Sequence, residues 1–292
     1  MSTANIIDAP EALVAYLDIL GYKAAINNQS VDKLIYYKAI DDMVSGLNAI
    51  PMYSGFKEII KIKNYISVNI FSDSIIFVFD QANFHKFELR SDGIITSAAL
   101  FNIFAYLISF FVHDCLRQIN HLCRGAIVRG QCYRRELENL AGNHFIFSKA
   151  LCDAHTNAES IADTPRILVH NSVLQAINDV AVLFCRNANP QNSLLIDSDG
   201  LYYLNVYKCF LDNPKAAFST SRCLAEILKQ CLKNNNDPPY YRHRRKWNWF
   251  IKYHNDMMSK MVSFSKMCPT LGYGDFETNI DSLIVKDEND SH

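Results

Sequence analysis

The sequence predicts an α+β fold, a layer sandwich of the split βαβ kind, and three observations lead to this prediction. Strand-like and helix-like segments alternate over the first part of the chain. Two consecutive β-rich runs, 64–71 and 74–80, interrupt the alternation and argue against an all-parallel sheet. An apolar fraction of 49% with 20% charged residues is typical of a globular protein that buries a sizeable core.

The first half of the chain supplies the elements of this sandwich in order. An apolar run over 12–20 predicts a buried strand, although Asp18 lies inside it, and apolar residues at helical spacing over 31–47 predict a helix after Gly21. The two β-rich runs predict a hairpin with Asp73 at or beside its tip. The remaining predicted elements are a helix over 96–121, a strand over 123–133, a short strand from 144, a helix from about Lys149 and a strand from Arg166.

The pattern changes after about residue 178, so we expect a core domain over 10–178 and a C-terminal α/β extension over 179–280. The extension contains a predicted hairpin over 194–207 and two predicted helices, 219–237 and 244–264. The polar and acidic segment 281–292 predicts a flexible tail.

Composition excludes several classes of function. The formal net charge of -1 gives no overall electrostatic attraction to nucleic acid or anionic lipid. The basic and aromatic segment 240–253 resembles a single-strand nucleic-acid platform in composition, but its helical spacing favours a packed terminal helix. Nine scattered cysteines without a Cys-x-x-Cys pair disfavour zinc, and the absence of a leader-like N-terminus predicts a cytoplasmic protein with reduced thiols. The longest apolar run, 99–112, is too short to span a bilayer, so we expect no direct membrane insertion.

Asp18 and Asp73 are each an acid inside or beside an apolar β segment. If the first strand lies beside the hairpin, the two carboxylates converge, and their mutual repulsion favours a bound cation. Mg²⁺ and Mn²⁺ prefer such oxygen ligands together with substrate phosphates, which indicates a phosphoryl-transfer site with two metal ions. The alternative is a surface turn aspartate and a second aspartate satisfied by backbone N–H groups. No P-loop and no Gly-x-Gly-x-x-Gly motif is present.

Three segments in order, "YLDILGY", "FSDSIIFVF" and "RGAIVRG", resemble landmarks of the class III nucleotidyl cyclase catalytic domain. The likeness is more specific to the bacterial pyrimidine cyclases of Pycsar antiphage systems, which share the serine before Asp73, the glycine-bearing strand and an Ala-rich helix leading to Pro165-Arg166-Ile167. The likeness covers roughly residues 10–175. It implies a ferredoxin-like antiparallel sheet with helices and a homodimer with the nucleotide at its interface. It also implies that UTP or CTP, with UTP favoured, is converted to a 3′,5′-cyclic monophosphate that a separate effector reads in phage defence.

The resemblance also assigns residues. Asp18 and Asp73 would be catalytic and, with the Ile19 carbonyl, would hold two Mn²⁺ or Mg²⁺ ions. The residues that would contact the substrate are Tyr16, Gly21, Tyr22, Asn69, Arg124 and Phe145.

Two departures from the purine cyclases qualify the resemblance. Segment 151–157 has neither the Asn nor the Arg that bind ribose and phosphate at the expected place, so another group must offset the charge on the α-phosphate, with Arg124, Arg129 and Lys149 as the candidates. Asn69 and Phe145 fit neither purine-selecting pair, which favours a smaller base. Two alternatives remain open, namely a purine cyclase and a catalytically inactive domain that senses a nucleotide.

Overall fold

The computed structural model describes residues 11–27, 33–46, 66–80, 97–136, 144–177, 193–211, 213–234 and 244–286. The elements of its first half are β1 (Glu11–Ile19), α1 (Tyr22–Asn27), α2 (Lys33–Gly46), β2 (Ile66–Phe71), β3 (Ser74–Asp80), α4 (Ser97–Ile119), β4 (Cys123–Glu136), β5 (His144–Ser148), α5 (Lys149–Thr156), the π-helix η3 (Asn157–Ile161) and β6 (Ile167–Val169). The predicted α+β class is confirmed. Residues 47 and 64–65, which we expected to extend a helix and a strand, lie outside the described residues.

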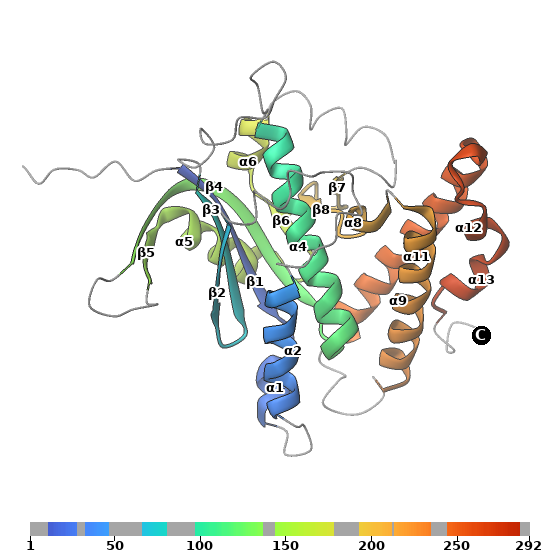
Figure 1. Cartoon of the computed structure of the whole chain (residues 1–292), viewed down its shortest axis with the longest axis horizontal. Coiled ribbons are helices and arrows are strands. Elements are labelled where there is room, and N and C mark those ends of the chain that lie inside the picture. The colour runs from blue at the N-terminus through green and yellow to red at the C-terminus, as the bar shows by residue number, and fades with distance from the viewer. Residues whose placement is uncertain are drawn as a thin grey trace, which may run out of the picture.

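An antiparallel sheet of the split βαβ kind organises this half of the molecule (Figure 1). Strand β1 lies between β3 and β4 and runs antiparallel to both, and β2 pairs with the outer edge of β3. The spatial order β2-β3-β1-β4 therefore inserts β1 between strands that follow it in the sequence. The predicted hairpin is confirmed, and the sheet is not all-parallel, as expected.

Strand β1 is buried on both faces, which explains its apolar sequence. Leu13 and Leu17 belong to the core cluster that α4 covers, whereas Val14 and Tyr16 belong to the cluster on the opposite face, where α5 lies. The fully buried residues of α5 and η3 are all alanines: Ala150, Ala154 and Ala158. Small side chains let this helix approach the sheet closely, and a Cβ added to Gly130 would lie 3.5 Å from the Ala150 Cβ.

The second half of the chain continues the same sheet. Strand β6 pairs parallel with β4, and its Leu168 lies opposite Tyr203 of the predicted hairpin. The 8-stranded sheet has the order β2-β3-β1-β4-β6-β8-β7, with β5 paired to β4. The elements of this half are α6 (Asn171–Ile177), β7 (Leu194–Ile196), β8 (Tyr202–Leu204), α8 (Lys208–Leu211), α9 (Pro214–Asn234), α11 (Arg244–Met267), the 3-10 helix η4 (Pro269–Leu271), α12 (Gly274–Thr278) and α13 (Ile280–Leu283).

Helix α11 packs as its sequence pattern predicted. Trp247, Phe250 and Tyr253 are buried, so the aromatic residues of the described part of segment 240–253 belong to the core. None of the helices in the described part of the chain is long and apolar enough to cross a membrane.

The expected flexible tail over 281–292 requires a correction. Leu283 and Val285 are buried in the core, because α13 packs against α11 and α9. Residues 287–292 lie outside the described residues. The short helices α6, α8, α12 and α13 were not predicted, since four to seven residues carry too little periodicity to be recognised. The division into domains at 178/179 stays a prediction.

Candidate functional site

The two aspartates lie at the same end of the sheet, Asp18 on β1 and Asp73 in the turn that precedes the neighbouring strand β3. The backbone N–H of Ile19 donates to the carbonyl oxygen of Asp73 at 2.9 Å, and Asp18 lies opposite Ser74 in the register of β1 and β3. The turn between β2 and β3 contains only Ser72 and Asp73, and Ser72 takes a left-handed conformation with φ 59°. The fold therefore brings the two segments together, as the sequence led us to expect.

Asp18 is a buried carboxylate whose partner is a guanidinium. Only 9% of the residue is exposed, and its Oδ2 accepts a hydrogen bond of 2.7 Å from Arg124 Nε. Burial raises the pKa of Asp18 above its usual value, Arg124 lowers it in part, and the nearby charges of Asp73 and Glu159 raise it further. The alternative in which backbone N–H groups satisfy this carboxylate is not what the structure contains.

Arg124 joins Asp18 to a second acid, Glu159. Arg124 lies directly opposite Asp18 in the register of β1 and β4, and the Arg124 Nη2 donates a hydrogen bond to Glu159 Oε1 at 2.9 Å. Burial lowers the pKa of Arg124, but the hydrogen bond to Asp18 and the charge of Asp18 outweigh this effect and raise the pKa above its usual value. The guanidinium therefore stays charged and neutralises much of the negative charge at this end of the sheet.

Tyr16 lies on the same face of β1 as Asp18, two residues earlier. Its hydroxyl group is hydrogen-bonded to Ser74 Oγ at 2.7 Å, and its ring packs edge-on against His155 at a centroid distance of 4.9 Å. Burial raises the pKa of Tyr16, so the phenol stays protonated. Tyr16 thus connects the aspartate-bearing strand to the hairpin.

Gly21 and Tyr22 form the turn after β1. Gly21 has φ 90°, a left-handed value that favours glycine, and the buried Tyr22 begins α1. Burial raises the pKa of Tyr22, and its hydroxyl group interacts with Tyr37 and Ser72. The turn therefore lies beside the hairpin tip, and its contact with phosphate stays a prediction.

The structure separates the two residues expected to select the base. Asn69 lies opposite Ile76, in the same cross-strand row as Tyr16, and its amide nitrogen is buried without a hydrogen-bond partner. Phe145 lies opposite Arg135 at the far end of β4, and its side chain is outside the described part of the structure. Because 11 positions of β4 separate Arg124 from Arg135, roughly 35 Å of strand lies between Phe145 and the aspartates. One chain does not bring them together.

The other candidate cations are engaged elsewhere. Arg129 forms an ion pair with Glu11 at 2.5 Å, and Lys149 forms one with Asp153 at 2.6 Å. Of the three cations considered from the sequence, Arg124 is the one that contacts Asp18.

Two charged residues near Asp18 were missed from the sequence. Glu159 follows the alanine stripe of α5 and η3 by one residue, a local signal that could have placed it near the sheet. Lys246 of α11 interacts electrostatically with Arg124, Asp18 and Glu159, although more than 200 positions separate it from Asp18 in the sequence. No local pattern predicts that interaction.

The carboxylates of Asp18 and Asp73 are oxygen donors of the kind that hard divalent cations prefer. Within the described residues, no group of three or more His, Cys, Asp or Glu side chains could hold a metal ion by itself. A pair of carboxylates at one edge is nevertheless the protein contribution that Mg²⁺ and Mn²⁺ sites commonly contain, because substrate phosphates and water complete the shell. Asp18 and Asp73 are donors of the type that such a site uses, and their binding of a metal stays a prediction.

No protein-family model and no curated protein sequence matches the chain. Solved structures that align with it include a dimeric guanylyl cyclase domain from the aquatic fungus Blastocladiella emersonii, with 11% identity, a TM-score of 0.42, and coverage of 67% of this chain and 93% of that chain. The guanylate cyclase domain of Catenaria anguillulae, solved with GTP, has 11% identity, a TM-score of 0.42, and coverage of 67% and 96%. The adenylyl cyclase CyaB of P. aeruginosa has 15% identity, a TM-score of 0.38, and coverage of 59% and 82%. Scores this low carry no argument about the present chain, so its function is argued from its own residues.

Proposed function

We propose that the chain is a metal-dependent pyrimidine nucleotidyl cyclase, a lyase that converts UTP, in preference to CTP, to the 3′,5′-cyclic monophosphate and pyrophosphate. The observation that carries this proposal is the placement of Asp18 on β1 beside the turn that contains Asp73, at one end of a split βαβ sheet. The sequence motifs around these residues resemble those of class III cyclases, which adds the reaction type.

In this proposal, Asp18, Asp73 and the Ile19 carbonyl hold two Mn²⁺ or Mg²⁺ ions. When bound, these ions would polarise the ribose 3′-hydroxyl and stabilise the pyrophosphate leaving group. The chain's own residues orient the triphosphate so that the 3′-oxygen attacks the α-phosphorus while the bond from that phosphorus to the bridging oxygen breaks. The hydroxyl proton passes to solvent, and Arg124 offsets charge on the α-phosphate once it is released from Asp18.

Base selection is assigned to Asn69. Its buried amide nitrogen lacks a partner, which costs free energy unless a ligand carbonyl accepts the hydrogen bond. Uracil offers such carbonyl oxygens at two positions and cytosine at one, which agrees with the preference for UTP.

A homodimer completes the proposed site. Phe145 is too far along β4 to reach the aspartates of its own chain, so a second copy would have to supply it. The cyclic product would then be read by a separate effector in antiphage defence. This role rests on the motif resemblance alone.

A catalytically inactive nucleotide sensor is the second candidate. The ion pair between Arg124 and Asp18 favours it, because a guanidinium occupies the carboxylate that a metal would need. A sensor would bind nucleoside triphosphates without turning any of them over.

The test compares Asp18→Asn with Asp80→Asn, which removes an equal charge at the opposite end of β3. We expect Asp18→Asn to reduce the Mn²⁺-dependent release of pyrophosphate from UTP by at least about a hundredfold. Asp80→Asn should retain the wild-type rate. Wild-type activity in the Asp18 variant would contradict the proposal, and triphosphate binding without turnover in the unmodified protein would favour the sensor.

A further inference from the structure

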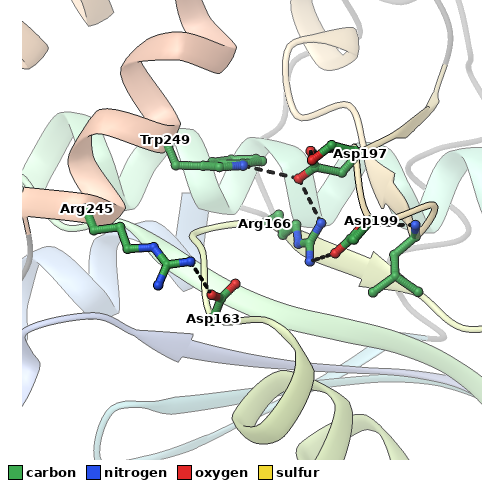
Figure 2. A network of polar contacts seen from close by, with 8 residues as sticks. Asp163, Arg166, Asp197, Asp199, Arg245 and Trp249 are labelled. Atoms are coloured by element: carbon green, nitrogen blue, oxygen red, sulfur yellow. Dashed lines mark hydrogen bonds and ion pairs between the residues drawn. The ribbon is translucent and has the colours of Figure 1, made fainter.

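Two polar contacts dock the first turns of α11 against the segment after η3 and against the end of β7 (Figure 2). Arg245 Nη2 lies 3.0 Å from Asp163 Oδ2, just after η3. Trp249 Nε1 donates to Asp197 Oδ2 at 3.2 Å, at the end of β7. The first contact joins the beginning of α11 to the segment that follows Glu159, and the second joins it to the end of β7.

A buried arginine connects this docking to the strand of Arg124. Arg166 is 5% exposed, and its guanidinium donates to Asp197 at 2.7 Å and also to Asp199. Its backbone carbonyl accepts from the N–H of Gly125 at 3.1 Å, the residue that follows Arg124. The position of α11 is therefore fixed relative to β4 at the candidate site.

Lys246 lies on the inward face of α11. Phe250, Tyr253 and Met257, which follow it by four, seven and eleven residues, are buried and share this face. Lys246 is itself half-buried, and no ion pair or hydrogen bond joins it to any residue in the described ranges. At least part of its side chain is therefore covered by the protein.

The charges around Lys246 belong to the candidate site. Burial lowers the pKa of Lys246, Arg124 lowers it further, and Asp18, Glu159 and Asp163 raise it. A half-buried ammonium group without a hydrogen-bonded partner is unfavourable. A bound anion would relieve this cost.

We propose that Lys246 is a phosphate-binding residue of the active site, supplied by the C-terminal part of the same chain that carries Asp18. This inference rests on the proposed function and extends it, since it assigns to α11 a direct contact with the polyphosphate of the substrate. An ammonium group is a suitable partner because its three N–H donors match non-bridging phosphate oxygens.

The test measures binding, which does not require turnover. Inorganic tripolyphosphate with Mn²⁺ is titrated calorimetrically into the wild-type chain, Lys246→Gln and Lys246→Arg. The control is Lys252→Gln, which removes the same charge from an exposed position of the same helix. From the strength of hydrogen bonds to charged groups, Lys246→Gln should bind at least about tenfold more weakly, and Lys246→Arg and Lys252→Gln should stay within about threefold of wild type. Thermal unfolding and near-UV circular dichroism check that each variant is folded.

Equal affinity of wild type and Lys246→Gln would overturn the inference, as would the absence of tripolyphosphate binding by the wild type. If the affinity falls as expected while no nucleotide is cyclised, Lys246 is a phosphate ligand and the proposed cyclase activity alone fails.

Discussion

Acid should destabilise this protein well above the pH at which carboxylates titrate, because two histidines are buried as neutral rings. His254 Nε2 donates to the Leu283 carbonyl at 2.8 Å, so its Nδ1 accepts from the Tyr207 hydroxyl at 2.5 Å. His113 Nε2 donates to the Val206 carbonyl at 2.7 Å. Both rings lie in the core that joins α4 to the C-terminal helices.

The loss in the free energy of unfolding at low pH follows from the pKa values of the two histidines. Burial lowers the pKa of His113 and of His254 from 6.5 to about 4. The unfolded chain therefore binds protons more readily than the native chain, so stability is complete above pH 6.5 and is lost as the pH falls towards 4. At about 1.4 kcal/mol per pKa unit, each ring should cost about 2 kcal/mol at pH 5 and about 3 kcal/mol at pH 4.

Urea unfolding at pH 7 and pH 5 measures this loss. Between pH 7 and pH 5, the free energy of unfolding of the wild type should fall by about 4 kcal/mol more than that of the double variant His113→Gln, His254→Gln. Each single variant should remove about half of this difference. Titrating carboxylates contribute equally to all of these proteins, so the comparison isolates the histidines. An identical pH dependence in wild type and double variant would refute the reasoning.

Two further substitutions test the packing around the candidate site. Gly125→Ala should lower the free energy of unfolding by about 3 kcal/mol or more in urea, because the new Cβ would lie 2.3 Å from the Tyr16 carbonyl oxygen. The control Gly274→Ala should have little effect, because its new Cβ would meet nothing within 4 Å. Equal stabilities of the two variants would contradict the expected clash. Arg166→Met should cost roughly 2–3 kcal/mol, because it leaves Asp197 without its buried partner while that carboxylate stays partly exposed. Unchanged stability of this variant would show that Arg166 does not stabilise the packing of α11 against the sheet.

The split βαβ core could be predicted because its signals are local. The apolar run around Asp18 and the short turn at Asp73 each specify a strand or hairpin within about ten residues. Their convergence followed from the expected pairing of β1 with the hairpin. The part of the candidate site visible to sequence reasoning was therefore the part carried by strands and turns.

The remaining contacts depend on side chains from distant segments. The pairing of Arg124 with Asp18 requires the register of β1 against β4, and the approach of Lys246 requires α11 to dock through Trp249 and Asp197. Neither the register nor the docking angle leaves a local pattern. Sequence reasoning named Arg124 only as one of three cations, and it did not find Lys246.

The measurement that tests the central claim most directly is the identity of the product. The wild-type chain is incubated separately with ATP, GTP, CTP and UTP in the presence of Mn²⁺, and the products are identified by mass spectrometry, with Asp73→Asn as the matched inactive protein. We predict a 3′,5′-cyclic pyrimidine monophosphate, chiefly from UTP, and no cyclic product from Asp73→Asn. A cyclic purine product would contradict the base assignment, and undiminished product from Asp73→Asn would contradict the assignment of this carboxylate.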